Sequence, residues 1–101
     1  MDINFEYDEV TSSSRLEEMA AKRLLKLADK YDFIIRADVL LKKENTSEPE
    51  TGMICQMRLS VPGPRLFAEA SHGNFEASIA ETADDLERQL RRKKEKMNKR
   101  G

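Results

Sequence analysis

The residues of this chain with the most distinctive chemistry are the bases at its C-terminal end. Residues 91–101 contain seven Lys and Arg against a single acid, Glu95, which gives a net charge of +6. Residues 1–90 contain 11 Lys and Arg against 18 Asp and Glu, a net charge of −7. The total of −1 therefore conceals a strongly dipolar molecule, one end of which can neutralise an anionic partner.

An amphipathic helix over residues 74–100 is expected to position these bases. At about 100° per residue, one lane of this segment is apolar, and it contains Phe75, Ile79, Ala83, Leu86, Leu90 and Met97. Asn74 is a suitable N-cap. Acids come early and bases late, which suits the helix dipole and permits the (i, i+4) pairs Asp84–Arg88 and Glu87–Arg91. Because Lys93 also falls in the apolar lane, we predict that a basic end, about 91–101, projects into solvent.

Catalytic chemistry has little support in the sequence. His72 is the only histidine, and its place beside Gly73 just before a helix predicts a loop residue. No Cys and His residues have metal-ligand spacing, and the glycines form no phosphate-binding pattern. Asp84 and Asp85 are expected on an exposed helix face among bases, where nothing prepares them for acid–base work. We therefore expect no enzyme, no cofactor and no metal site.

Length and composition predict one soluble domain over residues 1–101. A chain of this length can bury a modest core, and 39% hydrophobic with 37% charged residues favours a folded protein. Cys55 is the only cysteine and lies in an alternating strand pattern, so we expect a buried, inert thiol in a reducing compartment. No signal pattern and no span-length apolar stretch is present. A cytoplasmic protein without membrane association is expected.

Four segments, residues 2–8, 34–43, 53–61 and 64–71, alternate between apolar and polar residues as half-buried strands do. In the second, the inward set is Ile35, Ala37, Val39 and Leu41. A polar loop, 44–51, follows it, and Pro62-Gly63 suits a type II turn. Four apolar residues fall on the opposite face, which leaves open whether a partner covers part of it; they are Ile34, Leu40, Ile54 and Phe67.

A further helix is predicted between the first two strands. Thr11-Ser12-Ser13-Ser14 supplies N-cap candidates, and Ser14-x-x-Glu17 fits a capping box. The apolar lane that follows contains Leu16, Met19, Ala20, Leu24, Leu27, Ala28 and Tyr31. A second stripe is basic, and is either a solvated face or a binding surface; it contains Arg15, Lys22, Lys26 and Lys30, with Arg23 on its flank. The order β-α-β-β-β-α predicts an α+β domain of two layers, a four-stranded sheet with both helices on one face.

The last helix resembles a known family. Ala77-Ser78-Ile79 followed by Asp84-Asp85-Leu86-Glu87-Arg88-Gln89-Leu90-Arg91-Arg92-Lys93-Lys94-Glu95-Lys96 is similar to the last helix of the ribosome hibernation promoting factors, also called the ribosome-associated inhibitor or sigma-54 modulation family. The element order, the strand Leu66-Phe67-Ala68-Glu69 and the cap at Asn74 also match, so the resemblance spans essentially the whole chain.

The resemblance implies a fold similar to double-stranded RNA-binding domains. It also implies binding to 16S rRNA in the channel between head and body of the small ribosomal subunit, over the mRNA and tRNA positions, which idles the ribosome under stress. On this basis we expect phosphate contacts from Arg88, Arg91, Arg92, Lys94, Lys96 and Lys99, and from Lys22, Arg23, Lys26 and Lys30 of the first helix. A monomer away from the ribosome is expected, with no DNA partner.

Three positions depart from the family pattern. Glu76 stands where Tyr is common, Ala80 where Asp is common and Asp85 where Lys is common. Asp85 matters most, because it reverses the charge on a stripe shared with Arg88, Arg92, Lys96 and Lys99. The chain ends soon after the helix, as the short members of the family do.

The alternative function is a protein-interaction module whose basic C-terminal helix binds an acidic protein. Such a helix should carry an exposed apolar stripe, and Met97 is the only candidate residue.

Overall fold

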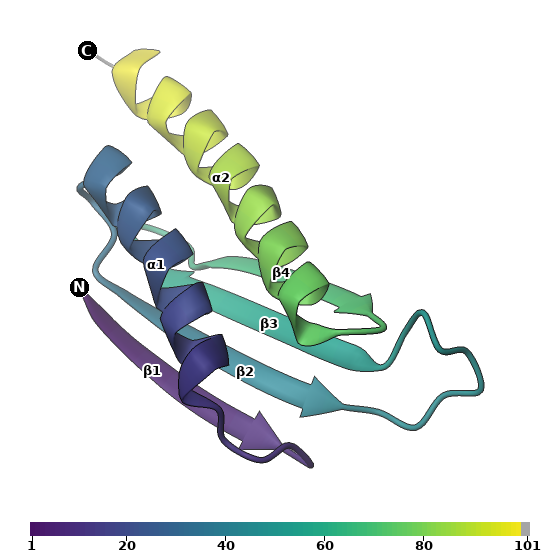
Figure 1. Ribbon diagram of the computed structural model, residues 1–101. Helices are drawn as coiled ribbons and strands as arrows, with labels where there is room; N and C mark the ends of the chain where they lie inside the picture. The colour runs from purple at the N-terminus through teal and green to yellow at the C-terminus, as the bar shows by residue number, and fades with distance from the viewer. Residues whose placement is uncertain (100–101) are drawn as a thin grey trace.

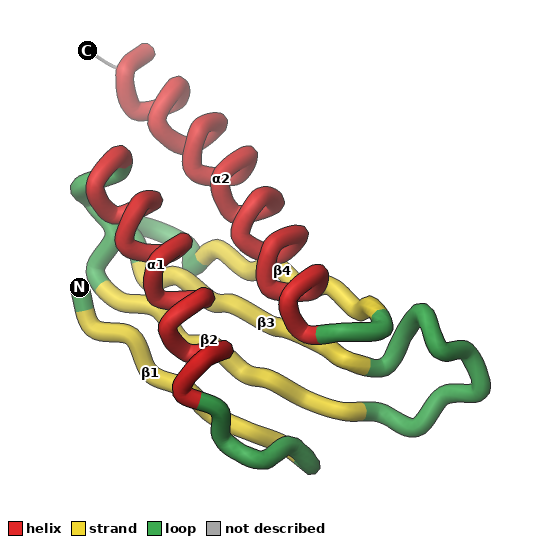
Figure 2. Tube along the Cα trace, viewed as in Figure 1, coloured by secondary structure: helices red, strands yellow, loops and turns green. Residues whose placement is uncertain are grey.

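The computed structural model describes residues 1–99, and the predicted two-layer α+β architecture is confirmed. Both helices cover the same face of the sheet (Figures 1 and 2). The elements in chain order are β1 (Asp2–Asp8), α1 (Ser14–Lys30), β2 (Arg36–Lys43), β3 (Met53–Ser60), β4 (Leu66–His72) and α2 (Phe75–Lys99). Residues 100 and 101, at the end of the predicted basic segment, lie outside the described residues.

The strands lie in the order β1-β2-β3-β4. β1 pairs with β2 in parallel, across the connection that contains α1, and the other two pairings are antiparallel. One cross-strand row on the helix-facing side is Phe5, Val39, Met57 and Ala68. One row on the opposite, open face is Asn4, Asp38, Arg58 and Phe67. The predicted alternation thus assigns most strand residues to the correct face.

The N-cap of α1 is one of the four predicted candidates, but it is not the serine of the predicted capping box. Ser13, not Ser14, is the N-cap, and its hydroxyl accepts a hydrogen bond from the Leu16 N–H at 3.3 Å. Glu17 does not complete a capping box with Ser14. Instead it accepts a hydrogen bond from the Tyr7 hydroxyl, which in turn accepts one from the Ser13 N–H. Burial is the main cause that raises the pKa of Tyr7, and the hydrogen bond to the Glu17 carboxylate raises it further. The tyrosine on β1 therefore contacts both the N-cap residue and the first turn of α1.

The strand boundaries require a further correction. β2 begins at Arg36 rather than at residue 34, so Ile34 and Ile35 precede it and do not follow its alternation. Ile34, expected on the open face, is 9% exposed and belongs to the core, whereas Ile35, expected inward, is 62% exposed. β3 ends at Ser60 and β4 runs from Leu66 to His72, so His72 ends a strand and is not a loop residue. Gly63 has φ 88°, as the third position of a type II turn requires.

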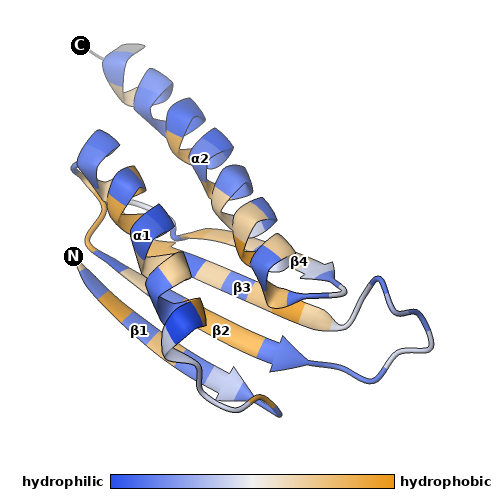
Figure 3. Ribbon diagram, in the orientation of Figure 1, coloured by the Kyte–Doolittle hydropathy of each residue, from blue (hydrophilic) through white to orange (hydrophobic). Residues whose placement is uncertain are grey.

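The core lies between the sheet and both helices. It includes Leu24 of α1, Leu41 and Met57 of the sheet, and Leu86 and Leu90 of α2, all fully enclosed. Cys55 is buried as expected, and burial raises the pKa of its thiol to about 11. The apolar lane of α2 is buried from Ile79 to Leu90, Phe75 before it is partly buried, and Met97 is exposed. Figure 3 shows the C-terminal turns of α2 to be almost entirely hydrophilic.

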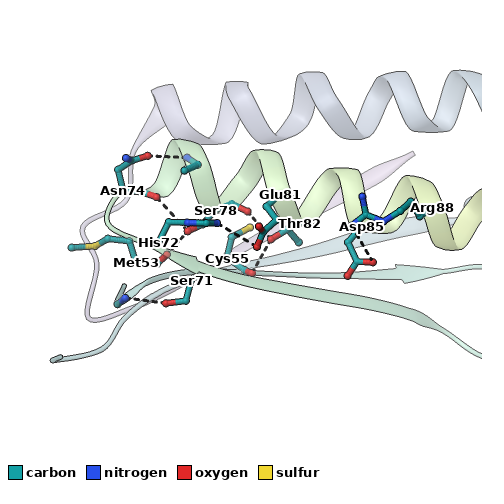
Figure 4. A network of polar contacts seen from close by, with 12 residues as sticks. Met53, Cys55, Ser71, His72, Asn74, Ser78, Glu81, Thr82, Asp85 and Arg88 are labelled. Carbon is teal, nitrogen blue, oxygen red and sulfur yellow. Dashed lines mark hydrogen bonds and ion pairs between the residues drawn. The ribbon is translucent and has the colours of Figure 1, made fainter. Parts of the chain in front are cut away.

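The N-terminal half of α2 is tied to β3 by polar contacts that periodicity does not predict. Asn74 caps the helix as expected, because its Oδ1 accepts a hydrogen bond from the Ala77 N–H at 2.8 Å. The next two turns bury Ser78 and Thr82, which are four residues apart. The Ser78 hydroxyl donates to the Met53 carbonyl, and Thr82 Oγ1 lies 3.1 Å from the Cys55 carbonyl oxygen (Figure 4). These contacts orient α2 over the sheet.

Candidate functional site

The directions of the two helices bring their basic halves together. Because two antiparallel pairings separate β2 from β4, those strands run in the same direction as β1. α1 returns across the sheet from the end of β1, and α2 does so from the end of β4 (Figure 1). The helices therefore run in the same direction, and their C-terminal ends lie at the same end of the helix layer.

Among the described residues, three ion pairs join the helices along their length, and each links a base of α1 to an acid of α2. We call this set the interhelix seam. Its nitrogen–oxygen distances are 2.8 Å for Arg15–Glu76, 3.7 Å for Arg23–Asp84 and 3.4 Å for Lys30–Glu87. The local pairs that the sequence permits, Asp84–Arg88 and Glu87–Arg91, are replaced by these contacts because α1 lies beside the acids.

The acids of the seam are the site residues that sequence reasoning missed. The only available signal was the excess of acids in the first half of α2, which gains meaning once α1 is known to lie beside it. The pKa of Glu76 is lowered mainly by the hydrogen bond that its carboxylate accepts from its own backbone N–H, and further by the hydrogen bond from Arg15. Glu76, which departs from the family pattern, is thus a seam residue.

A groove of about 430 Å³ lies between the helices. Its lining combines apolar residues with both signs of charge, and consists of Met19, Lys22, Arg23, Lys26, Leu27, Ala83, Asp84 and Glu87. Lys22 and Lys26 are exposed, and Arg23 is half-buried against Asp84. Of the four bases expected to bind on α1, Lys22 and Lys26 form no ion pair within the part of the chain that the structure describes, whereas Arg23 and Lys30 pair with acids of α2.

The bases of α2 fall into two groups. Arg91, Arg92 and Lys96 are exposed, and no ion pair links them to another described residue. Arg88 lies 3.9 Å from Asp85 (Figure 4). Lys94 lies over the ring of Tyr31, with its Nζ 5.7 Å from the ring centroid. Lys99 is the last residue of α2, and its side chain lies outside the described part of the structure.

Contacts with the domain continue beyond residue 91. Lys94 reaches Tyr31, and Lys93 lies beside Gly63: a Cβ added at Gly63 would be 3.5 Å from Lys93 Nζ. Lys93 is accordingly half-buried rather than free in solvent. The part of α2 without such contacts starts after Lys94 and lies beyond the end of α1 in Figure 1.

The described residues offer little for catalysis. Among residues 1–99, no three His, Cys, Asp or Glu side chains form a group that could hold a metal ion. His72 Nε2 lies 3.3 Å from Glu81 Oε2, so the single histidine forms a pair with an acid of α2 at the surface. Within the same residues, neither helix is long and apolar enough to cross a membrane.

Comparison with known proteins places this geometry in a family. Two ribosome hibernation promoting factors of Pseudomonas putida, one from strain KT2440, are each 28% identical to the chain over 96 residues, which cover 95% of this chain and 89% of theirs. Among solved structures, a ribosomal subunit interface protein from Coxiella burnetii has a TM-score of 0.77 at 21% identity, over 93% of this chain and 98% of its own.

The N-terminal domain of Thermus thermophilus Protein Y gives a TM-score of 0.74 at 20% identity, over 91% of this chain and 98% of the domain. These two likenesses concern the fold. The sequence profile of the family described as "Sigma 54 modulation protein / S30EA ribosomal protein" matches residues 3–98. The chain therefore belongs to the sigma 54 modulation protein / S30EA ribosomal protein family, as its last helix indicated.

Proposed function

We propose that this protein is a non-catalytic ribosome hibernation factor that binds the small subunit through the basic end of its helix layer. The relatives from Pseudomonas putida are hibernation promoting factors by name. The observation that carries the proposal is the gathering of exposed bases from both helices at one end. Clustered Lys and Arg side chains bind best to a partner with closely spaced phosphates. Among the described residues, the members of this gathering without an ion pair are Lys26 of α1 and Arg91, Arg92 and Lys96 of α2, and Lys22 lies farther back, at the middle of α1.

The proposed contact is with 16S rRNA in the decoding channel, where the domain blocks the mRNA and tRNA positions and so inhibits translation. The shape of the protein supports this placement. The molecule is elongated, 50 × 24 × 19 Å, and the turns of α2 after Lys94 extend beyond the end of α1 as a narrow helix. Such an extension can follow a channel lined by RNA backbone while the sheet remains behind it.

The alternative, binding of an acidic protein by α2, has less support. Met97 is the only large apolar side chain that α2 exposes among the described residues. One such residue does not form the i, i+3, i+4, i+7 stripe by which a helix binds in an apolar groove.

The test is co-sedimentation of the protein with purified small subunits, from about 50 to about 200 mM salt. Binding should weaken steeply with salt, because the bound bases release counterions from the phosphates. Arg91→Gln with Arg92→Gln should weaken it at least tenfold, and Lys42→Gln with Lys43→Gln, which removes the same charge at the far end of the sheet, should have little effect. Salt-independent binding, or equal loss in both variants, would contradict the proposal.

A further inference from the structure

The open face of the sheet has a charge character opposite to that of the basic end. Residues that point outward from the strands include three bases, Arg36, Lys42 and Arg58, and five acids, Asp2, Glu6, Asp8, Asp38 and Glu69. The sheet face is therefore acidic by two charges. Three of the five acids lie on β1, so the negative charge is concentrated along that edge strand.

The bases on this face are already engaged within the protein. Arg36 Nη2 lies 2.7 Å from Asp38 Oδ1, and Lys42 Nζ lies 3.2 Å from Glu44 Oε1 in the following loop. The Arg58 guanidinium lies over the ring of Phe67, 5.9 Å from its centroid. By contrast, Asp2, Glu6, Asp8 and Glu69 form no ion pair with any described residue. The unpaired charge on this face is almost wholly negative.

The same face contains a hollow with an apolar side. The hollow measures about 390 Å³, and Phe67, Leu40 and Arg58 contribute to its lining. Phe67 is 43% exposed on β4, and Leu40 on β2 is half-buried. An exposed aromatic ring beside a hollow can receive an apolar side chain of another molecule. The hollow extends across the sheet from Glu6 on β1 to Phe67 on the opposite edge strand, β4, so one bound segment can reach both the ring and the acidic edge.

We infer that the open face of the sheet binds a Lys- and Arg-rich protein segment that places one apolar side chain against Phe67. The carboxylates of Glu6 and Asp8 meet its bases, and the hollow receives the apolar residue. RNA is a poorer occupant of this face. Proteins that stack nucleobases on aromatic rings also provide a positively charged groove for the phosphates, whereas this face presents unpaired acids. The inference rests on the proposed function, since the partner is a protein of the small subunit. This partner contacts the face of the sheet that is opposite the rRNA-binding helices.

The first experiment places a photoreactive residue in the hollow. Phe67→p-benzoylphenylalanine is bound to purified small subunits, irradiated, and the adducts are digested and identified by mass spectrometry. We expect an adduct with a Lys- and Arg-rich peptide of a ribosomal protein. The same probe at Glu48, in the loop between β2 and β3, is the control and should not give that adduct. Adducts with rRNA, or none while the protein still co-sediments, would overturn the inference.

The second experiment removes the acids. Glu6→Gln with Asp8→Asn should weaken binding to small subunits roughly three- to tenfold at low salt, because two charge pairs are lost. The affinity of this double variant for protein-free 16S rRNA should not fall. Glu48→Gln with Glu50→Gln, which makes the same charge change in the loop, should leave subunit binding nearly unchanged.

Tighter or unchanged subunit binding by the Glu6 and Asp8 variant would overturn the inference, as would equal weakening on protein-free rRNA. Failure of the wild-type protein to bind subunits would overturn the proposed function and this inference together. Normal wild-type binding with a negative result at Phe67 would overturn the inference alone.

Discussion

Lys94 of α2 holds its ammonium group over the ring of Tyr31, the C-cap residue of α1, with Nζ 5.7 Å from the ring centroid. Lys30 Nζ lies 5.6 Å from the same centroid. The ring is almost fully buried and also makes an edge contact with Phe33, 6.1 Å between centroids. Tyr31 therefore joins the end of α1 to the last turn of α2 that contacts the domain, next to the exposed bases.

Tyr31→Leu should lower the free energy of unfolding by roughly 1–2 kcal/mol, because leucine keeps most of the apolar burial but loses the cation–π and aromatic contacts. Tyr31→Phe is the matched control, since it retains the ring, and should change stability much less. Urea unfolding of both variants measures the difference. Equal stability of the two would show that the ring contributes only its volume.

Removing the acids of the interhelix seam should strengthen ribosome binding. Asp84→Asn with Glu87→Gln releases Arg23 and Lys30 for phosphate contact, and exposed pairs of this kind are weak, so we expect roughly two- to tenfold tighter binding with little loss of stability. Co-sedimentation with small subunits measures the affinity. Glu48→Gln with Glu50→Gln controls for net charge alone, and the prediction fails if both variants gain affinity equally.

Asp85→Lys tests which flank of α2 faces RNA. Asp85 lies near β4, where Gln89 Nε2 is 3.4 Å from its Oδ1 and 2.8 Å from the Phe67 carbonyl oxygen. If this flank faces phosphate, an added base should tighten binding and steepen the log–log salt dependence by about 0.7–0.9.

Affinity at two salt concentrations, beside Glu50→Lys as a control for charge, measures the effect at position 85. Weaker binding by Asp85→Lys would mean that the carboxylate itself is a contact residue.

Cys55 should make stability depend on pH in the alkaline range. Its folded-state pKa is raised from 9.0 to about 11, so an unfolded thiol loses its proton first. The stabilisation from the neutral thiol is complete below about pH 9 and is lost as the pH rises through about 11. Because other groups titrate there too, the measured quantity is the difference in unfolding free energy between wild type and Cys55→Ala. This difference should shrink as the pH rises, and a constant difference would refute the prediction.

Periodicity and capping in the sequence determined the elements of this protein. The alternation of residues 2–8, the lane from Phe75 to Leu90 and the cap at Asn74 all reappear in the structure, because each depends on neighbours a few residues apart. The family was likewise readable from the last helix. Boundaries depend on tertiary contacts as well: β2 begins at Arg36 because Ile34 packs into the core, a contact that lies outside the strand pattern.

The tertiary structure alone decided which charges remain free to bind. On a helical wheel, Arg23, Lys30 and Lys94 lie outside the apolar lane just as Lys22, Lys26 and Arg91 do, yet the first three contact Asp84, Glu87 and Tyr31. These partners lie 57 to 63 positions away in the chain. They meet only because strand order makes the two helices run side by side in the same direction. Sequence spacing carries no information about such contacts, since electrostatic attraction depends on distance in space and not on separation along the chain.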